Sequence, residues 1–88
     1  MKSVAILGAS KDRTKFGNKS LRAHRAAGYE VLPIHPKESE IEGIAAYPSL
    51  AGLPHPVERI SVYLPPPVAL AMLPEIARAG AREVWFNP

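Results

Sequence analysis

The first apolar run of the chain, residues 4–7, is followed by small residues and then by basic residues. Together these could bind an anion. Gly8, Ala9 and Ser10 come directly after this run, and small side chains there let the backbone approach a phosphate closely. A basic cluster comes next, in a stretch of twelve residues with one acid. Such a cluster favours an anionic partner, although a solvated loop rich in lysine remains the alternative. The five bases are Lys11, Arg13, Lys15, Lys19 and Arg22.

The glycine spacing matches a dinucleotide fingerprint only in part. Gly8 takes the place of the first glycine of G-x-G-x-x-G, Ser10 stands at the second, and Gly17 follows after a longer loop. A helix that begins after such a loop offers free N–H groups and the positive end of its dipole. The pattern favours nucleotide binding over an ordinary βα turn.

The tip of the second predicted strand discriminates between nucleotides. NAD-binding units usually place Asp or Glu there, to hold the ribose 2′-hydroxyl. Here the strand ends in His35-Pro36-Lys37, with a base and no carboxylate. This counts against NAD and favours a ribose with an extra phosphate, as in NADP or coenzyme A. Lys37 as a plain surface turn residue remains the alternative.

The third strand tip reads Tyr63-Leu64-Pro65-Pro66-Pro67. A rigid apolar segment there could flank an adenine or a pantetheine arm, since ligands of open α/β sheets lie over the carboxyl ends of the strands. It could equally be only a strand terminator, because proline has no backbone N–H.

Catalytic and metal chemistry find little support. The chain has no cysteine, no serine in a G-x-S-x-G setting and no converging pair of carboxylates. Its three histidines lack partners at ligand spacing: His24, His35 and His55. We expect no catalytic residues and no metal site, and no catalytic activity of the chain alone.

Two elements must position the first loop. An aliphatic strand is predicted over residues 3–7, followed by a loop over residues 9–17. Asn18 or Ser20 could cap a helix that runs to about Ala27, and Gly28 stands where a helix C′ glycine belongs.

The remaining elements alternate in the same way. A second strand is predicted over residues 29–34, an irregular segment with one helical turn over 38–56, and a third strand over 59–64. A helix should follow over residues 68–79, kinked or split at Pro74, and Gly80 should end it. Residues 83–86 then form a fourth strand.

This order predicts an α/β fold: a Rossmann-like parallel sheet of at least four strands in one domain, residues 1–88. The chain ends on a strand with no helix behind it, so it looks truncated and the domain incomplete. A second copy of the chain or a larger subunit could cover the open sheet. With no signal peptide and no apolar span of membrane length, we expect a cytoplasmic protein without a membrane or nucleic-acid partner.

At this point a family resemblance becomes clear. The run VAILGAS with FGNK, then YEVLPIHPK, YPSL and SVYLPPPVALAMLPEIARAGAREVWF, resembles the small CoA-binding domain proteins. These are stand-alone relatives of the N-terminal domain of the succinyl-CoA synthetase alpha subunit. The resemblance covers nearly the whole chain and implies non-catalytic binding of coenzyme A or an acyl-CoA. From the residues alone, an NADP-type half of an enzyme completed by another chain stays open.

Carried over by position, the resemblance assigns four groups of residues. The first cradles the ADP phosphates, the second meets a phosphate through its lysine, the third lies beside the adenine or pantetheine, and the fourth matches the family's fourth strand tip. They are Gly8, Ala9, Ser10, Lys15, Phe16, Gly17 and Asn18; Pro36 and Lys37; Tyr63, Leu64, Pro65 and Pro66; Phe86 and Asn87. The chain departs from the family pattern at His35, where Asn is usual. Its Pro65-Pro66-Pro67 run is closer to the synthetase, and the family domain continues with at least one more βα unit.

Overall fold

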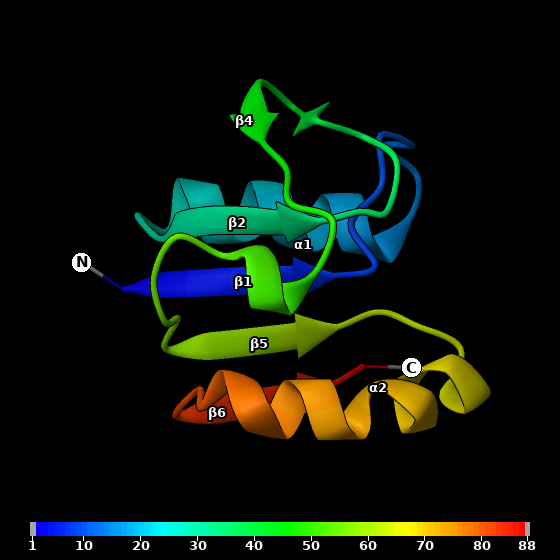
Figure 1. Ribbon diagram of the computed structural model, residues 1–88. Coiled ribbons are helices and arrows are strands. Elements are labelled where there is room, and N and C mark those ends of the chain that lie inside the picture. Colours follow the sequence, from blue (N-terminus) through cyan, green and yellow to red (C-terminus); the bar gives the residue numbers. More distant parts are fainter. Residues whose placement is uncertain (1, 88) are drawn as a thin grey trace.

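The computed structural model describes residues 2–87. Its centre is a four-stranded sheet in the order β2-β1-β5-β6, with every neighbouring pair parallel (Figure 1). The strands are β1 (Ser3–Leu7), β2 (Glu30–Ile34), β5 (Arg59–Val62) and β6 (Glu83–Phe86). This confirms the predicted Rossmann-like sheet.

The two helices cover opposite faces of this sheet. Leu21 of α1 (Phe16–Ala26) packs with Val4 and Ile6 on one face. On the other face, Ile76 of α2 (Pro66–Ala79) packs in the same cluster as Ala5 and Leu7. Successive strand residues point to opposite faces, so β1 fills both halves of the core, and all five of its residues are buried.

Helix α1 begins at Phe16, earlier than Asn18 or Ser20, so the predicted capping was wrong. The residue before it, Lys15, is extended at φ −82° and ψ 148° and makes no side-chain cap. Asn18 lies within the first turn, where its side chain is buried and bonds to the preceding loop. Packing against β1 therefore starts this helix, in place of a capping side chain.

Helix α2 continues through Pro74 without a break, so the predicted split was wrong. Proline inside a helix costs about 3 kcal/mol, because it removes one hydrogen bond and crowds the preceding turn. Ala69 and Ile76, on either side of Pro74, are both buried against the sheet, which favours one continuous helix. Its start at Pro66 also lies earlier than predicted, since proline is well suited to the first helical positions.

The segment between β2 and β5 is more regular than expected. It contains a short antiparallel hairpin of β3 (Glu40–Ile41) and β4 (Ile44–Ala45), then the 3-10 turn η1 (Leu50–Gly52). Ile41 is only 1 % exposed and joins the core cluster under α1. The hairpin is thus anchored to the domain, and η1 confirms the predicted helical turn.

One side of the molecule exposes apolar side chains. All four residues of β6 are exposed, and this strand forms one edge of the sheet among residues 2–87. The large apolar side chains exposed here are Val68, Leu70, Leu73, Val84, Trp85 and Phe86. That a second copy or a larger subunit covers this side stays a prediction. Within residues 2–87, neither helix is long and apolar enough to cross a membrane.

Candidate functional site

The carboxyl ends of the four parallel strands meet at one edge of the sheet, which we call the carboxyl edge (Figure 1). The chain leaves β1 for β2 on one side, and β5 lies on the other side of β1. The strand order therefore reverses between β1 and β5, where open α/β sheets bind their ligands. Gly8 and Tyr63 follow these two strands directly.

Two glycines hold the β1–α1 loop (residues 8–15) tightly against these tips. Gly8 has φ +94°, and a Cβ atom there would meet the carbonyl group of Tyr63 at less than 3.0 Å. A Cβ on Gly17 would meet the carbonyl oxygen of Gly8, again closer than real Cβ atoms approach. Neither position has room for a side chain. These are two of the roles of the fingerprint glycines: a tight turn and close helix–strand packing.

The N-terminus of α1 is suited to an anion. It has no side-chain cap and no acidic residue in its first turn. Free N–H groups and the helix dipole give such an end partial positive charge. Lys15 precedes it and is exposed, while Lys19 places its Nζ 5.2 Å from the centre of the Phe16 ring. Phe16 itself is 67 % exposed.

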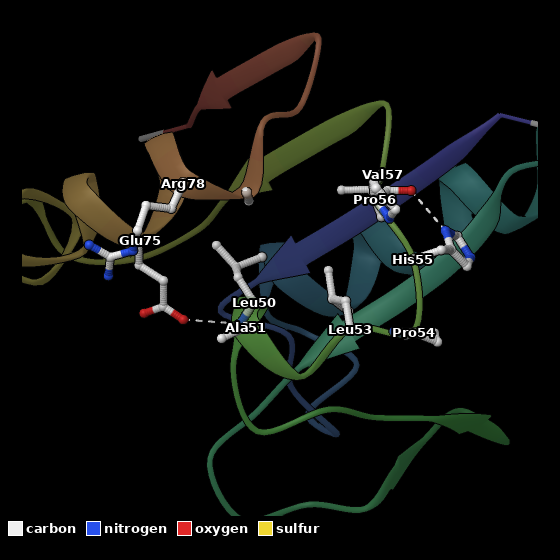
Figure 2. Close-up of a pocket in the computed structure, with 10 residues that line it drawn as sticks. Leu50, Ala51, Leu53, Pro54, His55, Pro56, Val57, Glu75 and Arg78 are labelled. Carbon is white, nitrogen blue, oxygen red and sulfur yellow. Dashed lines mark hydrogen bonds between the residues drawn. The ribbon is translucent and has the colours of Figure 1, made fainter.

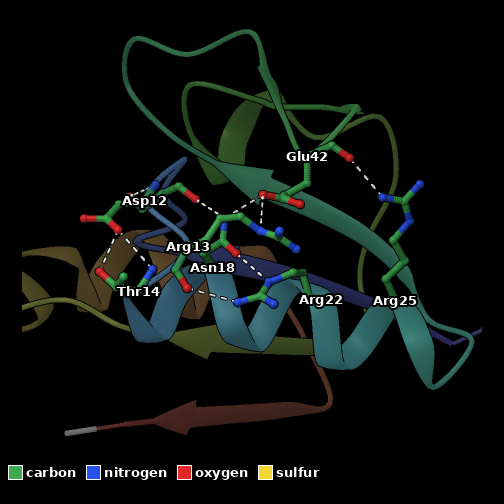
Figure 3. Close-up of polar contacts among 8 residues, drawn as sticks. Asp12, Arg13, Thr14, Asn18, Arg22, Arg25 and Glu42 are labelled. Atoms are coloured by element: carbon green, nitrogen blue, oxygen red, sulfur yellow. Dashed lines mark hydrogen bonds and ion pairs between the residues drawn. The ribbon is translucent and has the colours of Figure 1, made fainter.

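Asn18 supports the loop from inside the protein. It is fully buried, and its Nδ2 donates to the carbonyl oxygen of Ser10 at 2.8 Å and to Glu42 at 3.1 Å (Figure 3). Its Oδ1 accepts a hydrogen bond from Arg22 at 2.8 Å. With both ends of the amide engaged, the Asn18 side chain fixes the loop, and direct contact with a ligand stays a prediction.

The same loop is tied to the segment after β2. Lys11 forms an ion pair with Glu38, and the hydrogen bond between them lowers the pKa of the Glu38 carboxyl and raises that of Lys11. Within the loop, Asp12 accepts hydrogen bonds from the backbone and hydroxyl of Thr14, which lower its pKa. The first loop and the second strand tip thus lie side by side.

His35 organises the second strand tip. Its Nδ1 accepts hydrogen bonds from the backbone N–H groups of Lys37 and Glu38, each at 3.0 Å. The oxygen of an Asn side chain can close a turn in the same way, so either residue type suits this position. The turn leaves Pro36 and Lys37 exposed, and Lys37 forms no ion pair among the described residues.

The third strand tip separates two environments. Tyr63 packs against the core cluster under α1, whereas its neighbour Leu64 packs against the cluster under α2. On the α2 side, Leu64, Pro66 and Phe86 line an apolar hollow of about 380 Å³ together with Asn87. Asn87 also ties the tips of β5 and β6 together, since its Nδ2 donates to Ser61 Oγ and to the carbonyl oxygen of Val62.

The structure therefore brings the predicted residues to one edge in two groups. The β1–α1 loop, the start of α1 and the β2 tip lie together, as the Lys11–Glu38 pair shows. The tips of β5 and β6 form the second group, around the apolar hollow. Pro65 is exposed and extended at φ −55°, just before α2. Ala9 is buried under α1, so it offers only its backbone.

Two features escaped the sequence analysis. Glu42 bonds to Asn18, and the only signal for it was a Glu-Gly pair between short apolar segments. A second hollow, of about 550 Å³, lies between η1, the segment before β5 and the end of α2 (Figure 2). Glu75 borders it and accepts a hydrogen bond from the N–H of Leu50 at 3.1 Å. None of the predicted site residues lines this hollow. Across residues 2–87 no three potential metal ligands come together.

Comparison with known proteins places this geometry in a family. The CoA binding domain family matches residues 2–88. An ADP-forming acetate–CoA ligase from Methanocaldococcus jannaschii is 32 % identical over 81 residues, which are 92 % of this chain and 12 % of the ligase. The chain thus spans about an eighth of that relative's length.

Solved structures agree with this assignment. A conserved hypothetical protein from Pyrococcus furiosus superposes with a TM-score of 0.90 at 40 % identity, over all of this chain and 76 % of that one. The dinucleotide-forming acetyl-coenzyme A synthetase 1 of Ca. Korarchaeum cryptofilum, in complex with phosphate and ADP, gives 0.83 at 30 % identity. That match covers 91 % of this chain and 18 % of the synthetase. The family match along the chain, together with the glycine-packed loop at the carboxyl edge, shows that this chain belongs to the CoA-binding domain family.

Proposed function

We propose that this protein binds coenzyme A or an acyl-CoA at the carboxyl edge and performs no chemistry of its own. The observation that carries the proposal is the packing of Gly8 and Gly17, where no Cβ atom fits. That packing presses the backbone of the β1–α1 loop against the point where the strand order reverses. A polyphosphate is the ligand that such a backbone cradle and helix end suit best.

The residues present fit coenzyme A in charge and in polarity. The β1–α1 loop and Lys15 would hold the diphosphate, and Lys37 would meet the 3′-phosphate that sets this molecule apart from ADP. The apolar group of Leu64, Pro66 and Phe86 would lie beside the pantetheine or adenine. Coenzyme A would supply the thiol that carries an acyl group. This chain's own residues would bind and orient it.

A second candidate is the NADP-binding half of an enzyme that another chain completes. The β2 tip supports it equally well, because an exposed lysine that forms no ion pair among the described residues suits a 2′-phosphate as well as a 3′-phosphate. Co-purification with a larger subunit and tighter binding of NADP than of coenzyme A would favour this candidate.

The test is calorimetry with coenzyme A, dephospho-CoA, acetyl-CoA, NADP and NAD. We expect coenzyme A and acetyl-CoA to bind, and dephospho-CoA to bind about 10- to 100-fold more weakly, from the loss of one charged hydrogen bond. Equal affinities for coenzyme A and dephospho-CoA would remove Lys37 from the site. No binding of any member of this panel would reject the proposed function.

A further inference from the structure

The turn between β3 and β4 holds an unusual residue. Glu42 has φ +53° and Gly43 has φ +76°, the left-handed pair of a two-residue type I′ hairpin. Asn, Asp and Gly are the residues that favour the first of these positions, whereas a glutamate there is strained. Strained backbone of this kind persists where the surrounding contacts require that particular side chain.

The contacts of Glu42 all lead to the β1–α1 loop or to α1. Its carboxylate accepts a hydrogen bond from Asn18 Nδ2 at 3.1 Å and lies 3.4 Å from Arg13 Nε (Figure 3). Its backbone carbonyl accepts a hydrogen bond from Arg25 at 2.9 Å. The apex of the hairpin is therefore fastened to both ends of α1, through Asn18 in its first turn and Arg25 in its last.

Asn18 carries this connection on to the loop. The same Nδ2 atom that donates to Glu42 donates to the carbonyl oxygen of Ser10 at 2.8 Å. Both hydrogens of the amide are thus directed, one to the loop and one to the hairpin. Without the Glu42 acceptor, one hydrogen of a fully buried amide loses its partner, and only the bonds to Ser10 and Arg22 still hold the amide in place.

The hydrogen bond, more than the charge, dominates at Glu42. Its contact with Arg13 is the longer one, and the Arg13 side chain is 64 % exposed, whereas that of Glu42 is 20 % exposed. Exposed ion pairs contribute little, while a partly buried hydrogen bond to a charged group contributes more. A neutral acceptor of the same shape should therefore keep part of the stabilisation that the carboxylate gives.

We propose that Glu42 is a positioning residue for the β1–α1 loop, acting through Asn18 on Ser10, and that it preorganises the loop to receive a phosphate. The second half of this inference rests on the proposed function, whereas the first half does not. Glu42 touches no ligand in this scheme. It holds the residue that holds the loop.

The experiment compares E42A and E42Q with E40A as the matched control. Glu40 lies in β3 of the same hairpin and is exposed. E40A therefore removes one negative charge from the hairpin but keeps Glu42, the acceptor for Asn18. Hydrogen exchange of the amides of residues 9–15 is measured without ligand, and coenzyme A affinity by calorimetry. For E42A we expect faster exchange there and affinity lowered about two- to tenfold, the range for one lost hydrogen bond. E40A should match the wild type in both, and E42Q should lie between the wild type and E42A.

A second variant guards against general loss of the fold. E42G relieves the left-handed strain while it also removes the acceptor, so it should keep the wild-type melting temperature and yet lose affinity like E42A. Unchanged exchange of residues 9–15 in E42A and E42G would overturn the positioning role. Faster exchange with unchanged coenzyme A affinity would overturn its link to phosphate. If E42A and E42G exchange faster but the wild-type protein binds no coenzyme A, the proposed function is rejected and the positioning role is still supported.

Discussion

Gly17→Ala directs a methyl group at the carbonyl oxygen of Gly8, at a separation that real Cβ atoms do not show. The obstacle is backbone, so a side chain cannot turn away to relieve it, and α1 or the tip of β1 must move. Overpacking of this kind costs about 1–3 kcal/mol. The gain from alanine in a helix offsets at most about 1 kcal/mol of that cost.

The net loss should lie near 1–2 kcal/mol, which for a domain of this size lowers the melting temperature by about 5–15 °C. Because the N-terminus of α1 is displaced, coenzyme A affinity should fall by more than about tenfold, the equivalent of 1.4 kcal/mol. Thermal denaturation and calorimetry measure both effects at a temperature where the variant is folded.

Gly52→Ala is the matched control. The nearest atom to a Cβ on Gly52 is the Ser49 hydroxyl oxygen at 3.8 Å, an ordinary contact. This variant should stay within about 0.5 kcal/mol of the wild type and keep its affinity. A Gly17→Ala protein as stable as the wild type, with unchanged coenzyme A binding, would refute the argument that this close packing builds the site.

Three further outcomes are expected. Lys37→Ala should weaken coenzyme A binding about 10- to 100-fold and leave dephospho-CoA binding unchanged, and calorimetry showing equal losses would contradict the 3′-phosphate assignment. His35→Asn keeps an acceptor for the turn and should bind coenzyme A within about threefold of the wild type, whereas His35→Ala should lose about two- to tenfold; equal affinities of the two variants would argue against the turn. His55 has a pKa above its ordinary 6.5, because its ring bonds to the carbonyl oxygen of Pro56 and to the carboxylate of Glu30. The protonated His55 ring therefore stabilises the fold fully below about pH 6.5, and this stabilisation is lost as the pH rises through the folded pKa. The melting temperature should fall as the pH rises above about 6.5, and His55→Ala should flatten this slope.

The sheet was predictable because its strands carry unambiguous signals. Most of the buried residues of β1, β2 and β5 are aliphatic, and β1 is followed directly by Gly8. The helices were less predictable, since α1 starts without a capping side chain and α2 tolerates Pro74. In both, tertiary packing overrides the local preference of the residues.

The strand tips that form the site were predictable, but the hydrogen bonds that connect them were not. The tips had to share one edge once the strands were parallel. The alternation of a strand over residues 59–64 already places Tyr63 and Leu64 on opposite faces, but nothing in the sequence indicated that Asn18 is buried with both ends of its amide bonded. The β3–β4 hairpin was missed because two-residue strands are too short to show a periodicity, and Glu42 was missed with it.

The most direct measurement is a titration of the isotopically labelled protein with coenzyme A, followed by the backbone amide signals in nuclear magnetic resonance. We expect saturable shifts of Gly8, Ala9, Ser10 and the first turn of α1, together with Lys37. The amide signals of the non-proline residues among 50–57 that border the second hollow should stay in place: Leu50, Ala51, Leu53, His55 and Val57. An absence of saturable shifts, or shifts confined to residues 50–57, would contradict the claim that the carboxyl edge receives the phosphates of this ligand.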